Sequence, residues 1–150
     1  MLYGADAEVA AWIAGRIPGY RPESDTRALG VIKDGDLVAG VTYERWNGLH
    51  CEVSIAALPG SAWADRRTLF ALFHFPFVQL GCEAITVLVP MTNLLSLNLA
   101  TKLGFERQAI IPFAARDGSP LIVLQQFRGR CRWLGYGQGK QQRARGAGSV

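Results

Sequence analysis

The stretch that decides the fold is residues 84–105, which read AITVLVPMTNLLSLNLATKLGF. Its first six residues are almost all apolar and do not alternate with polar ones, as expected of a strand covered on both faces. Thr92 or Asn93 can cap a following helix, because such side chains accept a backbone N–H of the first turn. Gly104 allows a left-handed exit from that helix. One face of the helix carries an apolar stripe made of Leu95, Leu99 and Leu103.

The segments on either side of this stretch predict two more helices and five more strands. Residues 6–17 have apolar side chains at helical spacing. Residues 64–80 form the other expected helix, with Pro76 bending it or marking its last turn. Strands are expected at residues 30–33, 37–43, 50–58, 105–113 and 121–127.

Turn signals fix how these segments connect. Asn47-Gly48 predicts a type I′ hairpin turn, because both central residues of that turn need positive φ. Asp34-Gly35 and Asp117-Gly118 mark two more turns. The first three strands should form an antiparallel meander, and residues 50–89 a right-handed parallel crossover. The sequence therefore predicts a mixed α/β (α+β) domain over residues 1–134.

Composition limits the classes of protein that fit. The chain has 150 residues, 49% of them hydrophobic, and no run approaches the ~20 apolar residues of a membrane span. The first residues have no basic segment before an apolar core, so no signal peptide is expected. The odd count of three cysteines favours neither a disulfide framework nor a metal site, so a reducing cytoplasm is expected.

The net charge of +4 belongs to the end of the chain. Residues 1–127 carry 10 Lys and Arg against 12 Asp and Glu, so a nucleic-acid-binding surface over the whole domain is not indicated. Residues 135–150 are rich in Gly, Gln and Arg and predict a disordered basic tail. The tail and the arginines before it, Arg128, Arg130 and Arg132, leave nucleic-acid association open, the alternative being a merely solubilising tail.

The segment Asn93-x-x-Ser96-x-x-Leu99-Ala100-x-Lys102-Leu103-Gly104-Phe105, entered from a buried strand, resembles the second half of the GCN5-related N-acetyltransferase (GNAT) signature. With the order of elements, the resemblance covers roughly residues 28–127, after a shortened N-terminal region. A finer resemblance, to short phage-type acetyltransferase-like proteins, rests on Val38-Ala39-Gly40-Val41, Phe73-His74-Phe75-Pro76-Phe77 and Cys131-Arg132-Trp133-Leu134. If a phage encodes the chain, the cytoplasm would be the host's.

The GNAT resemblance implies a mostly antiparallel mixed sheet whose central parallel strands splay apart between flanking helices. It implies transfer of an acetyl or other acyl group from acetyl-CoA, or another acyl-CoA, to a primary amine, and no metal. Nothing in the sequence indicates which amine. The alternative is a non-catalytic acyl-CoA-binding or interaction module with the same fold. A homodimer is also open, through the exposed final strand and Trp133.

The same resemblance implies which residues would bind CoA. Asn93 and Ser96 would contact pantetheine or a phosphate group. Backbone N–H groups near Ile55, Ala56 and Ala57 would bind the acyl carbonyl and pantetheine. The family's phosphate loop, Gln/Arg-x-x-Gly-x-Gly/Ala, falls on Ser61, Ala64 and Arg66, so its glycines are absent here.

A helix N-terminus at residues 62–66 would still offer unpaired amides to the pyrophosphate. Arg66 and Arg67 would add positive charge, the alternative being that both lie on a solvated helix face.

Candidates for the chemistry lie on the strand before that loop. Glu52 matches the family's general base, and the alternative is a solvent-facing glutamate near a hairpin. His50 is a possible base or relay on the same strand face, or a plain surface residue. Glu44 is the reserve base. Ala100 occupies the place where the family often has a tyrosine as general acid.

Overall fold

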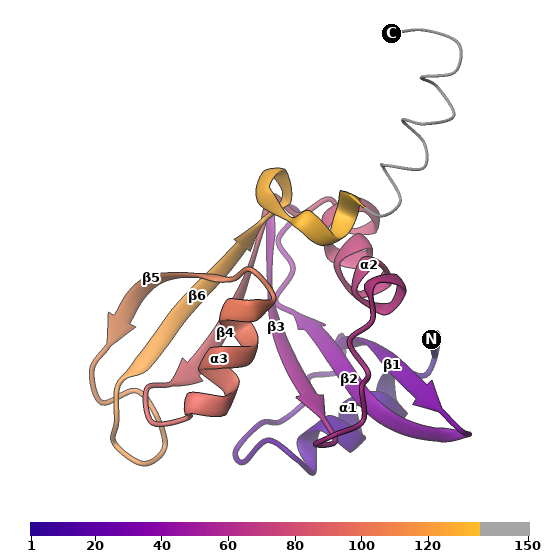
Figure 1. Cartoon of the computed structure of the whole chain (residues 1–150). Coiled ribbons are helices and arrows are strands. Elements are labelled where there is room, and N and C mark those ends of the chain that lie inside the picture. Colours follow the sequence, from indigo (N-terminus) through magenta and orange to yellow (C-terminus); the bar gives the residue numbers. More distant parts are fainter. Residues whose placement is uncertain (136–150) are drawn as a thin grey trace, which may run out of the picture.

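The computed structural model describes residues 1–135, so the expected tail lies outside the described residues from residue 136 on. Six strands form one sheet in the order β1-β2-β3-β4-β6-β5 (Figure 1). The strands are β1 (Arg27–Lys33), β2 (Asp36–Glu44), β3 (His50–Ala57), β4 (Ala84–Pro90), β5 (Glu106–Ile111) and β6 (Leu121–Phe127). The helices are α1 (Asp6–Ala14), α2 (Arg66–His74) and α3 (Leu94–Lys102), with a π-helical turn at Phe75–Gln79 and 3₁₀ turns at Arg128–Arg130 and Arg132–Leu134.

The predicted meander and parallel crossover are both confirmed. Strands β1, β2 and β3 pair antiparallel in chain order, and β3 pairs parallel with β4. The remaining pairings, β4 with β6 and β6 with β5, are antiparallel. The parallel pairing covers only His50↔Ala84, Cys51↔Ile85 and Glu52↔Thr86. Beyond these pairs β3 and β4 diverge, and the two halves of the sheet form a V (Figure 1).

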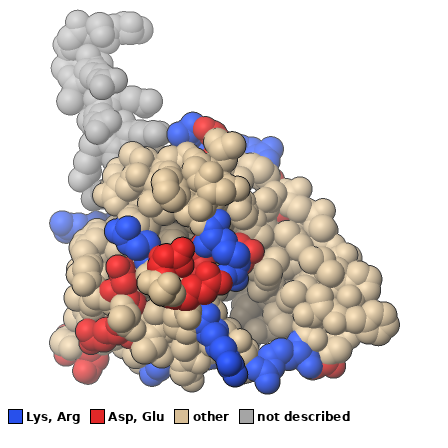
Figure 2. Space-filling view, turned by 180° about the vertical axis from the view of Figure 1, so that it is seen from behind, with Lys and Arg blue, Asp and Glu red and all other residues tan. Residues whose placement is uncertain are grey.

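Two clusters of buried side chains hold helices on opposite faces of the sheet. The larger includes Leu72 of α2, Leu97 of α3 and Val53 of β3, so both helices cover the same face. The smaller packs Val9 and Ile13 of α1 against the other face of β1 and β3. On that second face, in the half made of β4, β6 and β5, Figure 2 shows few charged side chains.

The expected helix over residues 64–80 is shorter and changes its winding. It begins at Arg66, and the α-helix ends at His74, where the π-helical turn takes over. Pro76 has no N–H to donate to the carbonyl four residues earlier, so the regular ladder stops there. The N–H of Leu80 donates instead to the carbonyl oxygen of Phe75, five residues earlier, at 2.9 Å.

The predicted type I′ turn at Asn47-Gly48 is wrong. Residues 45–49 form a longer connection, and the left-handed residues in it are Arg45 (φ 53°) and Gly48 (φ 95°). The side-chain oxygen of Asn47 accepts the N–H groups of Leu49 and His50 at 3.0 and 2.9 Å. Asparagine here caps its own loop, which removes the need for positive φ at Asn47.

Gly104, at the exit of α3, gives a test of the fold. Its φ is +99°, and a Cβ would lie 2.5 Å from Nε2 of Gln126, which donates to the carbonyl oxygen of Leu103. Gly104→Ala should therefore lower the free energy of unfolding by about 1–3 kcal/mol, measured by urea denaturation. Gly81→Ala is the control, because Gly81 also has positive φ (+72°) but open space around its Cβ position. Equal losses in both variants would contradict the clash with Gln126.

Candidate functional site

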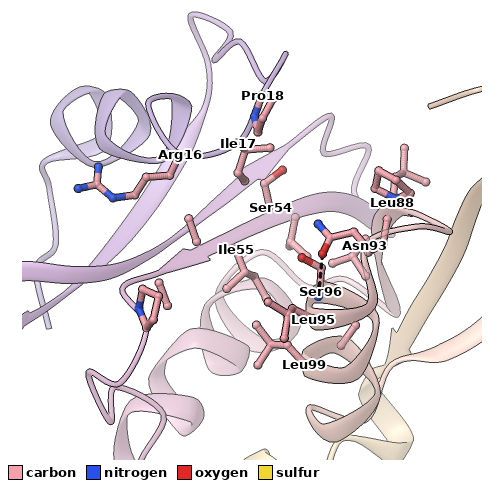
Figure 3. A pocket seen from close by; sticks show the side chains of 18 of the residues that line it. Arg16, Ile17, Pro18, Ser54, Ile55, Leu88, Asn93, Leu95, Ser96 and Leu99 are labelled. Carbon is pink, nitrogen blue, oxygen red and sulfur yellow. Dashed lines mark hydrogen bonds between the residues drawn. The ribbon is translucent and has the colours of Figure 1, made fainter. Parts of the chain in front are cut away.

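A cavity of about 530 Å³ lies where β3 and β4 diverge. Its wall is formed by residues 16–18 after α1, residues 53–59 of β3 and beyond, residues 87–90 of β4, and the start of α3. In Figure 3, Ile17 and Pro18 approach from one side of β3, and Leu95 and Leu99 lie on the other. The cavity therefore lies between the strands and is bounded by residues from both faces of the sheet.

The backbone of β3 presents hydrogen-bond donors to this cavity. The N–H of Leu58 donates to the carbonyl oxygen of Val38 on β2 at 2.8 Å. Because N–H groups alternate in direction along an antiparallel strand, the N–H of Ala56 also faces β2, whereas those of Ile55 and Ala57 face β4. Pairing with β4 ends at Glu52, before either residue. Of the three expected amides, those of Ile55 and Ala57 point into the opening and that of Ala56 does not, and the side chain of Ala56 packs near α1.

The start of α3 forms the wall of the cavity opposite β3. The predicted cap is confirmed: the N–H of Ser96 donates to Oδ1 of Asn93 at 3.2 Å, and both residues line the cavity (Figure 3). Ala100 lines it as well. Arg16 is the only charged residue among the described residues of the lining, and its guanidinium lies over the ring of Trp12 at 3.7 Å. The lining is thus mostly apolar, with polar groups at a few fixed places.

The expected phosphate-binding residues lie beyond the cavity. In the segment that follows β3, the last residue of its lining is Pro59. The lining includes none of Ser61, Ala64, Arg66 and Arg67. The expectation of a helix N-terminus at residues 62–66 is wrong, because α2 begins only at Arg66.

Asp65, which sequence reasoning missed, caps α2. Its carboxylate accepts the N–H of Thr68 at 2.8 Å, and this hydrogen bond lowers the pKa of Asp65. A carboxylate therefore occupies the helix end at which phosphate was expected. An aspartate just before an apolar-periodic segment is a known N-cap signal, and this signal could have identified it.

Glu52 lies beside the cavity rather than in its lining. It shares a strand face with Ser54, which does line the cavity. Its carboxylate pairs with Nε of Arg45 at 2.9 Å, and its side chain is 30% exposed. Burial opposes the charge on Arg45, but the carboxylates of Glu52, Glu23 and Glu44 together outweigh it, and the pKa of Arg45 is raised.

His50, two residues earlier, is half-buried rather than a plain surface residue. Its Nε2 lies 2.5 Å from Oγ1 of Thr86, which also accepts a hydrogen bond from Gln125 at 3.1 Å. The contacts link β3, β4 and β6 on the face that carries Glu52. They fix the imidazole near the point where β3 and β4 separate.

A buried polar cluster lies next to Glu52, and of its members sequence analysis considered only Glu44, as the reserve base. Glu44 is opposite Glu52 in the β2–β3 register, is 4% exposed, and accepts a hydrogen bond from Thr26 at 2.8 Å. Tyr20, from the connection after α1, has its hydroxyl beside Thr42 and Glu44, and burial is the main cause that raises its pKa to about 12. These contacts join residues far apart in the sequence, and no short motif predicts them.

The three arginines considered for nucleic-acid association pack on the domain itself. Arg128 pairs with Glu83, and Arg130 pairs with Glu106 at 2.9 Å. Arg132 donates to the carbonyl oxygen of Lys102 and lies over the ring of Trp133. These side chains hold the C-terminal turns against β4, β5 and α3.

The solved structures similar to this chain include N-acetyltransferases. A chimera of the spermidine N-acetyltransferase SpeG from Vibrio cholerae has a TM-score of 0.61 and 17% identity, over 70% of this chain and 68% of that one. A point mutant of SpeG gives 0.63 and 18%, over 77% and 72%. The fold is that of the GNAT N-acetyltransferases. Another chain with this fold, the Campylobacter jejuni N-acetyltransferase PseH in complex with acetyl coenzyme A, gives 0.54 and 14%, over 71% and 70%.

The GNAT fold is the part of the sequence resemblance that the structure confirms. The finer likeness to phage-type proteins finds no support in these structures, which include bacterial enzymes. No family model and no curated protein matches the sequence. Within the described residues, no helix is long and apolar enough to cross a membrane.

Proposed function

We propose that the chain transfers an acetyl or other acyl group from a CoA thioester to a primary amine. The observation that carries the proposal is the cavity between β3 and β4, with the N–H groups of Ile55 and Ala57 directed into it. A mostly apolar passage with fixed donors suits pantetheine and a thioester carbonyl, because such donors stabilise charge that develops on the oxygen. The GNAT fold and the acetyl-CoA complex of PseH support the assignment.

In this proposal the acyl group reaches the sheet where β3 and β4 separate. Glu52 accepts a proton from the amine, directly or through water, with His50 as a possible relay on the same face. Asn93 and Ser96 contact pantetheine from α3. Ala56 supports β3 by packing rather than by binding the cofactor.

The pyrophosphate would lie beyond the lining of the cavity, along the connection from Pro59 to α2. Ser61 and Ala64 would border it there, and Arg66 and Arg67 would supply positive charge. Asp65 stands between these groups and repels phosphate, so we expect weaker binding of CoA than a glycine-rich loop would give.

The first test is isothermal titration of the protein with acetyl-CoA, followed by release of free CoA thiol in the presence of a panel of primary amines. Spermidine belongs in the panel because SpeG, which has the same fold, is a spermidine N-acetyltransferase. Binding and acetylation of at least one amine are the expected results. No binding at near-millimolar acetyl-CoA would overturn the proposal. Binding without transfer to any amine would favour the non-catalytic module.

Asp65→Asn tests the position of the pyrophosphate. Asparagine keeps the cap of α2, so stability should change little, but one negative charge near the phosphates disappears. The affinity for CoA should rise about two- to fivefold, as expected for one exposed charge interaction, and the gain should shrink at high salt. Acetylpantetheine, which lacks the phosphates, is the control ligand, and its affinity should stay the same. An equal gain for both ligands would place the pyrophosphate elsewhere.

A further inference from the structure

Arg45 is held in an unusual backbone conformation directly after β2. Its φ of +53° is in the left-handed region, which residues other than glycine seldom adopt. From there the guanidinium reaches two carboxylates on different parts of the chain: Nε pairs with Glu52 at 2.9 Å, and Nη1 pairs with Glu23. An uncommon backbone conformation thus places a cation on the carboxylate that we propose as the base.

The second carboxylate connects Arg45 to the cavity. Glu23 lies in residues 15–26, the connection between α1 and β1, and residues 16–18 of the same connection line the cavity. Arg45 therefore links Glu52 on β3 to the segment of residues 15–26, part of which lines the cavity. Glu44 adds to the negative charge around Arg45 from the neighbouring position on β2.

A general base needs a carboxylate that is free to accept a proton, whereas Glu52 is paired with Arg45. A carboxylate already paired with a guanidinium is a poor acceptor for a proton from an ammonium group, so Arg45 must leave Glu52 before transfer. The side chain of Arg45 is 52% exposed, and those of its partners Glu23 and Glu52 are 48% and 30% exposed. Exposed ion pairs of this kind contribute little to stability, because water screens them, so a second cation can replace Arg45 at low cost.

We propose that Arg45 is a positioning residue that holds the carboxylate of Glu52 and the segment of residues 15–26 until the ammonium group of the acceptor displaces it. The proposal rests on the proposed function. After displacement the ammonium group gives one proton to Glu52, and the amine nitrogen forms a bond to the acyl carbon. The C–S bond of the thioester breaks, and a second proton from the nitrogen ends on the CoA thiol. The products are the amide and free CoA.

The kinetic test uses Arg45→Gln and Arg45→Lys with the amine that the wild-type protein acetylates best. Arg45→Gln removes the competing cation, so the KM for the amine should fall about two- to fivefold, the range of an exposed ion pair. Its kcat should fall as well, because the carboxylate loses its alignment. Arg45→Lys should restore both parameters. Arg130→Gln, which breaks an exposed pair with Glu106, is the matched control and should change neither.

A second measurement does not need turnover. Hydrogen exchange of residues 15–26 in the wild-type protein should become faster when millimolar spermidine is added, because the amine displaces Arg45 and releases this segment. In Arg45→Gln the exchange should be fast without spermidine and unchanged by it. The proposal for Arg45 would be overturned if the exchange rate of the wild-type protein did not change with spermidine and equalled that of Arg45→Gln. If no amine is acetylated but exchange responds as expected, the proposed function fails. The role of Arg45 in holding residues 15–26 until an amine displaces it then stands.

Discussion

Glu52→Gln is expected to lower turnover by about 10²–10⁴-fold while leaving the affinity for acetyl-CoA unchanged. Glutamine keeps the shape of the side chain and an oxygen for Arg45, but it cannot accept a proton at neutral pH. Glu52 does not line the cavity, so its loss should not disturb the binding of the cofactor. Steady-state kinetics with the best amine and titration with acetyl-CoA measure the two effects separately.

Glu106→Gln is the matched control for this experiment. Glu106 occupies the same level of the sheet as Glu52, since the register runs from Glu52 through Thr86 and Gln125 to Glu106. It is also paired with an arginine, Arg130. Because it lies on the outer strand β5, its replacement should not change turnover. If Glu52→Gln is as active as Glu106→Gln, Glu52 is not the base, and the buried Glu44 becomes the next candidate.

Phe77→Ala is expected to lower the free energy of unfolding by about 3–5 kcal/mol. Phe77 lies in the π-helical turn, is fully buried, and stacks with Phe73 of α2 at a ring separation of 6.4 Å. Removing a buried ring costs its transfer free energy and leaves a cavity that the structure fills only in part. Urea denaturation measures the loss.

The neighbouring residue provides the control. Val78 is in the same turn but is 53% exposed, so Val78→Ala should change stability by no more than about 0.5 kcal/mol. A comparable loss in both variants would mean that the turn itself, rather than the packing of Phe77, limits stability. A loss below about 1 kcal/mol for Phe77→Ala would show that the core around it collapses easily.

The sequence was enough to predict those parts of the fold that depend on neighbouring residues. Asn93 caps α3, and Gly104 leaves it with positive φ, as the local pattern indicates. The parallel pairing of β3 with β4 followed from the long crossover between them. These features depend on capping chemistry, glycine conformation and connection length, which a sequence displays directly.

Other parts of the site depend on residues that are distant in sequence. The pairing of Arg45 with Glu23 crosses 22 positions, and Tyr20 approaches Glu44 only because the connection after α1 folds over β2. The failed turn at Asn47 has a different cause, because an asparagine side chain can satisfy backbone N–H groups itself. Composition and periodicity do not show these contacts between distant residues or these side-chain hydrogen bonds. The fold was therefore predicted better than the contacts around Glu52.

The three residue pairs between β3 and β4 are the backbone pairing that joins the two halves of the sheet. The two three-stranded halves share this short backbone pairing and one buried cluster of side chains, and the proposed cofactor would lie across the gap between them. A ligand that binds only the native state stabilises it by about 2.7 kcal/mol at a concentration one hundred times its Kd. The free energy of unfolding would then rise with the concentration of CoA thioester. Protein without bound CoA thioester would be the form most easily cut by proteases.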